Sequence, residues 1–270
     1  MARLLHERGA VALGAVVARD SKHVADAIAF VRAGSASSIQ GLPPAQLTLI
    51  ATPDDAIETV VRQLTQHAWR PGDIAFHCSG ALSSSVLAPL AERGVAVASV
   101  HPLKSFADPA VAIRNFRDTW CACEGDSAAL AVLGPLFDAV GARRFTVEAQ
   151  GKTLYHAAAV LASNDLVALM EAALRCMAAA GVAQEQAWPA LRTLVDGTLD
   201  NLDSMPPREA LTGPVARGDL GTVARQLQAV ETLDADIAAS YRALGRVALS
   251  LALLDDAGRA ALGEMLGGKP

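Results

Sequence analysis

The densest group of reactive side chains lies in residues 151–164, which read GKTLYHAAAVLASN. Lys152 and His156 stand four residues apart in this otherwise alanine-rich stretch. On an α-helix, that spacing separates two side chains by about 40° around the axis and about 6 Å along it. Both can therefore point into one site, where either could give a proton to a substrate. The alternative is a solvated lysine at a helix start and a hydrogen-bonded histidine in a seam between domains.

Three further residues are candidates for contact with a substrate. Ser163 and Asn164 follow His156 by about two helical turns, or about 12 Å, which is too far to share one substrate atom. They could instead hold a loop, a cofactor amide or a partner subunit. Arg217 lies in residues 211–219, LTGPVARGD, and its guanidinium could clamp a carboxylate. That segment could equally be a helix connection in which Asp219 caps the next helix.

Small and polar residues follow three of the apolar runs expected to form strands. Thr52 and Pro53 follow the run 47–51, Ser79 and Gly80 follow 74–78, and His101 follows 95–100. Because ligands bind outside the carboxyl ends of parallel strands, these five residues are candidates for binding a cofactor. The same sequence also permits simpler roles, in which Thr52 is the N-cap of a helix and His101 is a histidine bonded to backbone.

Arg19, Ser21 and Lys22 follow the first expected strand, 11–18. In a dinucleotide-binding fold this position meets the adenosine ribose, where an acidic residue favours NAD and basic or hydroxyl residues favour NADP. The three residues favour NADP over NAD, although Asp20 between them blurs the distinction. A solvated turn with Ser21 as the N-cap explains them equally well.

The elements that must position these residues change in type near residue 150. Before it, short apolar runs alternate with amphipathic stretches, which predicts an α/β domain with a mainly parallel sheet. After it, the sequence predicts only helices. We therefore expect a Rossmann-like domain in residues 1–149 and a helical domain in residues 150–270. The expected strands are 11–18, 47–51, 74–78, 95–100, 120–123 and 144–147, and the later helices are 154–180, 184–202, 219–232 and 234–254.

The composition excludes several classes of protein. Apolar residues make up 52% of the 270 residues, the formal net charge is −5, and no basic cluster offers a surface for nucleic acid. The four cysteines show no paired spacing, which is typical of reduced thiols and predicts no metal site. No apolar run approaches the roughly 20 residues that span a bilayer. We expect a cytoplasmic protein with no membrane or nucleic-acid partner.

The first residues lack a feature of dinucleotide-binding domains. Such a domain opens with a strand, a G-x-G-x-x-G turn and a helix that faces the pyrophosphate. Here residues 2–8 already resemble the end of that helix, and no GxGxxG occurs in the sequence. We expect that the natural protein starts upstream, and the upstream DNA would test this. The alternative is a shortened protein.

Four motifs together resemble a known bacterial family. They are HCSG at 77–80, SVHPLKSF at 99–106, KTLYHAAAVLASN at 152–164 and LTGPVARGD at 211–219. The family joins a Rossmann-like domain to a helical DUF2520 domain and is described as predicted NADP-dependent oxidoreductases. It is similar to pyrroline-5-carboxylate reductases, prephenate dehydrogenases and the 6-phosphogluconate and 3-hydroxyacid dehydrogenases. The resemblance implies a homodimer built through the helical domain.

The hydroxyacid enzymes carry Lys-x-x-x-Asn on the first interdomain helix, with the lysine as acid or base. Lys152 matches that lysine, whereas His156 stands in place of the asparagine. The first hypothesis is therefore an NADP-dependent oxidoreductase acting on a small carbonyl or imine, possibly one that bears a carboxylate. The second is a non-catalytic dimeric binding or scaffold protein. A third, by family analogy, is a ketopantoate-reductase-like enzyme.

Overall fold

The computed structural model describes residues 1–267. By their contacts the residues form two compact units, Met1–Asn164 and Asp165–Pro270. The type of secondary structure changes after β7, which ends at Thr146, close to the expected domain boundary at 149/150. The boundary between the compact units lies later in the chain, after Asn164, because a buried side chain of the helix after β7 bonds to the sheet, as described below.

The first unit is built on a sheet with the order β3-β4-β5-β6-β7. Strands β3 (Leu47–Ile50), β4 (Ile74–His77) and β5 (Ala96–Pro102) are parallel, and their carboxyl ends share one edge. Strands β6 (Trp120–Gly125) and β7 (Arg143–Thr146) are parallel to each other. The predicted α/β class with a mainly parallel sheet is confirmed.

The pairing of β5 with β6 is antiparallel, which the sequence analysis did not foresee. The connection between them contains one short helix, α5 (Pro109–Arg114). An antiparallel neighbour needs no crossover over the face of the sheet, whereas a parallel one does. The chain therefore turns back beside β5.

A small separate sheet pairs β1 (Ala15–Val16) with β2 (Ser35–Ala36) in parallel, joined by α2 (Ser21–Val31). The expected strand 11–18 is thus reduced to two residues, and β2 lies outside the expected strands. Gly34 has φ +91°, and a Cβ there would lie 2.9 Å from Val16 Cγ2. Only glycine permits this close pairing of two very short strands.

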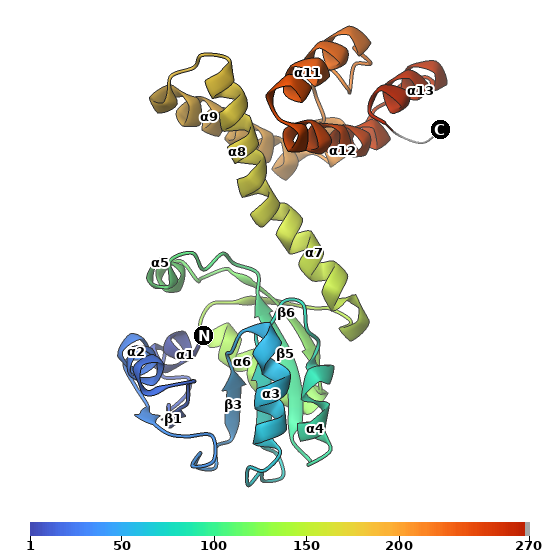
Figure 1. The fold of residues 1–270 in the computed structure, drawn as a ribbon. Helices are drawn as coiled ribbons and strands as arrows, with labels where there is room; N and C mark the ends of the chain where they lie inside the picture. The colour runs from blue at the N-terminus through green and yellow to red at the C-terminus, as the bar shows by residue number, and fades with distance from the viewer. Residues whose placement is uncertain (268–270) are drawn as a thin grey trace. The chain divides into compact units, whose positions relative to one another are not determined.

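Helices cover both faces of the large sheet (Figure 1). On one face α1 (Ala2–Glu7) and α6 (Ser127–Ala139) pack over a core that includes Phe76, Phe116 and Phe137. On the other face α3 (Asp54–Leu64), the 3₁₀ turn η1 (Ser84–Leu87) and α4 (Ala88–Ala91) cover a second core. The segment between β4 and β5 thus contains a 3₁₀ turn followed by one α-helical turn.

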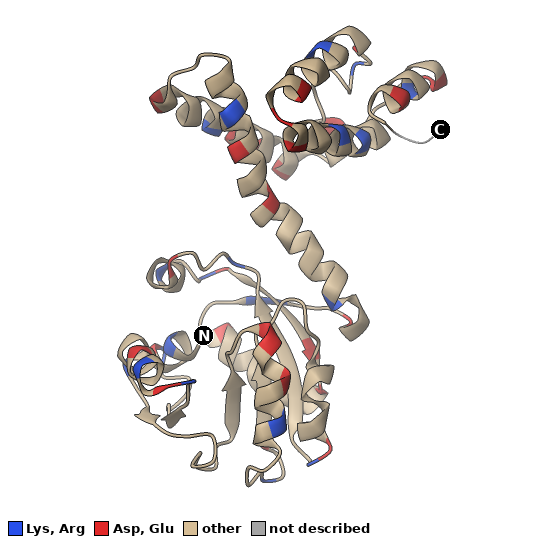
Figure 2. Cartoon of the chain, viewed as in Figure 1, with Lys and Arg blue, Asp and Glu red and all other residues tan. Residues whose placement is uncertain are grey.

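The expected helix 154–180 is broken at Ser163, which has φ −127° and ψ −67°. It forms α7 (Lys152–Ala162), after a 3₁₀ turn η2 (Ala149–Gly151), and α8 (Asn164–Ala179). Figure 2 shows α7 without charge beyond its first residue. By length and composition alone, Ala149–Ala179 contains a window with mean hydropathy 1.5 that is apolar enough to cross a membrane, which is weak evidence for a membrane span.

The second unit is helical, as predicted. Its core contains Val223, Leu262 and Leu266, all fully buried. Asp219 caps α11 by accepting a hydrogen bond from Thr222 N, which confirms the predicted cap. Pro189 lies inside α9 rather than at its start. The remaining helices of this unit are α9 (Gln184–Ser204), α10 (Pro207–Ala210), α11 (Leu220–Leu233), α12 (Ala235–Leu251) and α13 (Asp256–Met265).

Candidate functional site

A buried lysine joins α7 to the sheet. Lys152, the first residue of α7, is only 1% exposed. Its Nζ donates one hydrogen bond to the carbonyl of Ser79, just after β4, and another to Oγ of Ser99 on β5, both 2.9 Å long. Burial lowers the pKa of this ammonium. Lys152 thus holds the start of α7 against the carboxyl ends of two strands.

A buried carboxylate offsets the charge of this lysine. Glu124 on β6 is 4% exposed and accepts hydrogen bonds from Ser84 N at 2.6 Å and Ser84 Oγ at 2.7 Å. Its negative charge is the largest influence that raises the pKa of Lys152, against the larger effect of burial. A buried charge is strongly unfavourable unless an opposite charge or hydrogen bonds compensate it. Glu124 therefore acts on Lys152 through its charge, since the direct hydrogen bonds of Lys152 go to Ser79 and Ser99 and those of Glu124 go to Ser84.

The turn after β4 is fixed by hydrogen bonds. His77 Nδ1 accepts from Ser79 N at 3.1 Å, and its Nε2 donates to Ser83 O at 3.2 Å, which assigns the proton to Nε2. Ser79 Oγ donates to the carboxylate of Asp54 at 2.7 Å and accepts from Leu82 N at 2.9 Å. His77 is fully buried, as the sequence analysis expected. Its role is to shape the turn that carries Ser79 and Gly80.

Two imidazole rings and a phenol meet above this turn. His101 Nδ1 lies 2.7 Å from the hydroxyl of Tyr155, and the rings of His101 and His156 lie edge to face with centroids 5.9 Å apart. A Cβ on Gly80 would lie 2.9 Å from His101 Nε2 and within clashing distance of His156. Glycine at position 80 therefore leaves the room that both rings occupy.

The pKa values of His101 and Tyr155 are shifted in opposite directions from their ordinary values. Burial, followed by the charges of Lys152 and His156, lowers the pKa of His101 to about 4. Burial raises the pKa of Tyr155 to about 12. At neutral pH both groups are therefore uncharged. Because a phenol is a stronger donor than a neutral imidazole, we assign the hydrogen bond as Tyr155 O–H to His101 Nδ1, which leaves the imidazole proton on Nε2.

A cavity of about 430 Å³ opens at the same edge of the sheet. The Oγ1 atom of Thr52 is buried there without a hydrogen-bond partner in the part of the chain that the structure describes. A buried hydroxyl without a partner is costly, and a polar ligand would satisfy it. The residues that line the cavity are Met1, Leu49, Ile50, Ala51, Thr52, Asp54, Cys78, Ser79, His101, Pro102, Lys104 and Phe106.

These residues fit one half of a dinucleotide. The cavity lies outside the carboxyl ends of β3, β4 and β5, where open α/β sheets bind their ligands. Thr52 and Asp54 carry oxygen atoms that can bond to hydroxyl groups of a ligand, and His101 lines the same cavity. Thr52 is not the N-cap of α3, as one interpretation of the sequence held. That position belongs to Pro53, which makes no side-chain cap bond.

The three residues expected near the ribose lie in the turn between β1 and α2. Asp20, not Ser21, is the N-cap of α2, and its carboxylate accepts from His23 N at 2.9 Å. The charged carboxylate of Asp20 is a strong acceptor for the backbone N–H groups of the first turn. Ser21 is already the first residue of the helix, so it does not cap it. Arg19 contacts His23 and Asp20, and its side chain is 76% exposed. Lys22 is also exposed.

Two of the three expected substrate residues lie at the junction of α7 and α8, and the third belongs to the second compact unit. Ser163 and Asn164 end α7 and begin α8, and both are exposed. Arg217 belongs to the second compact unit, in the turn before α11, where its backbone N donates to Gly213 O. Their contact with a substrate remains a prediction.

Sequence reasoning missed four residues of the cluster, Asp54, Ser99, Glu124 and Tyr155. The sequence contained a signal for Ser99, because residues two apart on a strand share a face and His101 follows Ser99 by two residues. The sequence also contained a signal for Glu124, because it is the single charged residue within the apolar strand WCACEG. Tyr155 stood inside the motif but was given no role. Asp54 gave no signal beyond that of an acidic residue in the first turn of a helix.

Comparisons with known proteins agree with this arrangement. A sequence profile of the Rossmann-like domain matches residues 6–102, and one of DUF2520, a domain of unknown function, matches residues 119–248. None of the curated protein sequences compared with the chain matches it. A solved protein from Thermotoga maritima is 26% identical, with TM-score 0.71, and the match covers 93% of this chain and 94% of that one.

Two more distant structures share the fold. An imine reductase from Myxococcus stipitatus in complex with NADP⁺ has TM-score 0.63 at 11% identity, covering 98% of this chain and 95% of that one. A 1-pyrroline-5-carboxylate reductase from Streptococcus pyogenes has TM-score 0.59 at 15% identity, covering 92% and 93%. The fold is thus that of a Rossmann-like domain followed by a helical region. The chain belongs to the proteins that join a Rossmann-like domain to a DUF2520 domain.

The low pKa of His101 gives a testable prediction. Its ring, which faces Tyr155, His156, Lys152 and Asp54, should titrate near pH 4 and stay neutral through neutral pH. Below pH 6.5 the unfolded chain takes up a proton at this ring before the folded chain does, so stability should fall as the pH drops toward 4. Imidazole nitrogen NMR, assigned with His101→Asn, measures the midpoint. A midpoint near 6.5 would contradict this environment.

Proposed function

We propose that the protein is an NADP-dependent oxidoreductase that acts on the carbon–oxygen or carbon–nitrogen double bond of a small molecule. The hydrogen bond between Tyr155 and His101, at the mouth of the cavity beside β3–β5, carries this proposal. The hydrogen-bonded pair supplies a proton donor, and the cavity beside it suits a dinucleotide. Reduction of a carbonyl or imine needs both.

The residues of the cluster can move the required proton. When a nicotinamide is bound, it supplies or accepts the hydride. In the direction of reduction, His101 Nε2 gives its proton to the oxygen or nitrogen of the substrate, and Nδ1 takes the phenolic proton of Tyr155. The phenolate that remains faces the ammonium of Lys152, whose Nζ lies 5.7 Å from the centre of the tyrosine ring. Oxidation runs the same steps in reverse.

Lys152 and His156 were the donors expected from the sequence. Two of the three protons of the Lys152 ammonium are already bonded, and its side chain is 1% exposed, so it has no direct path to a substrate. We assign it the role of holding Tyr155 in place and compensating negative charge. His156 packs against His101 and Gly80, where it can contact the substrate and set the orientation of the His101 ring.

The basic residues after β1 support NADP as the cofactor. The guanidinium of Arg19 is largely exposed, and Lys22 lies beside it on the first turn of α2. Both can contact the 2′-phosphate that distinguishes NADP from NAD. Asp20 is occupied as the cap of α2, which leaves its carboxylate less free to bond the 2′-hydroxyl of NAD.

Tyr155→Phe tests the role of the hydroxyl. Loss of the terminal donor should lower kcat with NADPH by at least about 100-fold, a typical contribution of a general acid. NADPH affinity, measured by fluorescence titration, should stay within about twofold, because the phenol does not hold the cofactor. Stopped-flow oxidation of NADPH against a panel of small carbonyls and imines measures the rate.

Tyr241→Phe is the matched control, since this other tyrosine lies in the second unit and bonds to Gln226. It should leave the rate unchanged. A fully active Tyr155→Phe variant would show that the phenol gives no proton. A protein that binds no NADPH at about millimolar concentration would instead rule out the oxidoreductase and favour a binding or scaffold protein.

We further propose that the helical unit forms a homodimer. On α8 and α9 the apolar side chains of Val167 and Leu194 are 71% and 68% exposed, and Leu199 and Leu202 are also exposed. Large apolar side chains exposed on two helices of one unit are typical of a surface that a partner covers. A second copy of the same face is the partner that buries it symmetrically, because an isologous interface pairs like with like.

Light scattering on the intact protein tests the dimer. The wild type should elute with twice the mass of the chain. Leu194→Glu should shift it toward the monomer because a charge would be buried in the interface, whereas Arg225→Glu on α11 should not. A monomeric wild type that binds lipid vesicles would show instead that a membrane covers the apolar face.

A further inference from the structure

One positive charge in the wall of the cavity beside β3–β5 has no role in the mechanism proposed above. Lys104 follows the end of β5 by two residues and lines this cavity together with His101. Its side chain is half-buried, and within residues 1–267 its ammonium makes no hydrogen bond or ion pair. An unpaired ammonium beside a proposed proton donor can bind an anionic group of the ligand.

The backbone fixes Lys104 relative to His101. Leu103 N donates to the carbonyl of Trp120 at 2.8 Å, which ties the residue before Lys104 to the start of β6. Lys104 N donates to the carbonyl of Pro102 at 2.9 Å, so the chain turns sharply directly after β5. The lysine is thus held three residues beyond the imidazole, on a turn that is bonded to the sheet.

The other titratable side chains in the cavity wall leave this charge uncompensated. The carboxylate of Asp54 accepts a hydrogen bond from Ser79 Oγ at 2.7 Å, and in the described chain no ion pair joins it to Lys104. Burial raises the pKa of the Cys78 thiol to about 11 and lowers the pKa of His101 to about 4, so both are uncharged at neutral pH. Among the side chains that line the cavity, all of them described, Lys104 is the unpaired cation.

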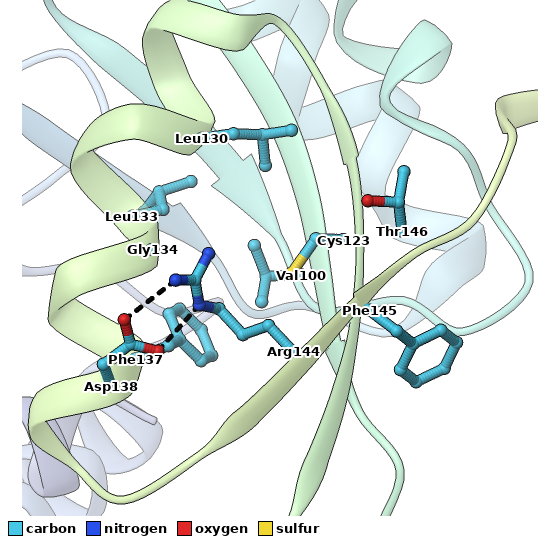
Figure 3. A pocket seen from close by; sticks show the side chains of 10 residues that line it. All are labelled: Val100, Cys123, Leu130, Leu133, Gly134, Phe137, Asp138, Arg144, Phe145 and Thr146. Carbon is cyan, nitrogen blue, oxygen red and sulfur yellow. Dashed lines mark hydrogen bonds and ion pairs between the residues drawn. The ribbon is translucent and has the colours of Figure 1, made fainter.

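The other hollow of this unit contains a cation that is already compensated. It lies on the α6 side of the sheet, where Arg144 extends from β7 and donates to both carboxylate oxygens of Asp138 at 2.7 and 2.8 Å (Figure 3). That guanidinium has its counter-charge within the protein. Lys104 does not, and the few polar groups in the wall of a concave site are the ones that orient a bound ligand.

The charge of Lys104 suits a carboxylate on the substrate. A carboxylate carries one negative charge, which one ammonium can compensate, whereas a phosphate carries nearly two and three acceptor oxygens. Lys104 and His101 line one cavity of about 430 Å³. An anion bound to Lys104 can therefore belong to the same small molecule as the double bond that His101 protonates.

We propose that Lys104 binds a carboxylate of the substrate, which is a small oxo acid, or the imine of such an acid, rather than a neutral ketone. The identity of the reacting bond rests on the proposed oxidoreductase function, whereas the anion site does not. In reduction, the carbon of the double bond gains the hydride of NADPH and its oxygen or nitrogen gains the proton of His101. The products are NADP⁺ and a hydroxy or amino acid.

Calorimetric titration tests the anion site without turnover. The wild-type protein is titrated with 2-oxobutanoate, 3-oxobutanoate and 4-oxopentanoate, both alone and with NADP⁺, which cannot reduce an oxo acid. At least one acid should bind saturably with Kd below about 10 mM. Its carboxamide, which keeps the size but loses the charge, should bind at least about tenfold more weakly. No binding by any of the three acids, or equal binding of acid and amide, overturns the proposal.

Variants in the connection between β5 and β6 assign the charge to Lys104. Lys104→Met should weaken binding of the acid at least about tenfold, whereas Lys104→Arg keeps the charge and should stay within about threefold. Arg114→Met removes an equal charge from the end of α5, outside the cavity wall, and should leave Kd within about twofold. Should Lys104→Met fail to fold, the comparison of acid and amide on the wild type still decides the matter.

Kinetics separate this proposal from the proposed function. In Lys104→Met, KM for the acid should rise about tenfold or more while the Kd of NADPH stays within about twofold. A rise in the Kd of NADPH instead would place a phosphate of the cofactor on Lys104 and overturn the proposal. Turnover of amides as readily as acids would contradict the carboxylate site and leave the oxidoreductase standing. Binding of the acid through Lys104 without any NADPH binding would do the reverse.

Discussion

The buried ammonium of Lys152 is the contact on which the candidate site depends. It ties the first turn of α7 to the ends of β4 and β5 through two hydrogen bonds, and the charge of Glu124 opposes the lowering of its pKa by burial. One helical turn later, Tyr155 and His156 are thereby placed over the turn that carries Gly80. A sheet and a helix distant in sequence thus form one site.

The same burial sets the chemistry of the site. Burial, together with the positive charge of Lys152, keeps His101 uncharged, and burial keeps the proton on Tyr155. Two neutral groups joined by one hydrogen bond can transfer a proton without first separating charge in an apolar environment. In the proposed transfer, the ammonium of Lys152, 5.7 Å from the centre of the Tyr155 ring, is the positive charge that would offset the phenolate.

Much of the fold could be predicted from the sequence because apolar runs and turn residues alternate clearly before residue 147. The strand ends at Ser79 and His101 followed from the same pattern. The antiparallel return of β6 did not, since the connection at 103–119 is long enough for a crossover. Neither did the break at Ser163, where no glycine or proline interrupts an alanine-rich helix. The electrostatic effect of Glu124 on Lys152 acts between distant segments, and no local pattern contains it.

A double-mutant cycle on Lys152 and Glu124 tests this account most directly. The free energy of unfolding would be measured by urea denaturation for Lys152→Met, Glu124→Gln and the double variant. Lys152→Met should cost about 3 kcal/mol or more, because it leaves a buried carboxylate uncompensated. The double variant should be more stable, by at least about 1 kcal/mol, than the sum of the losses in the two single variants predicts. Additivity within about 0.5 kcal/mol would contradict the claim that these two buried charges hold the site together.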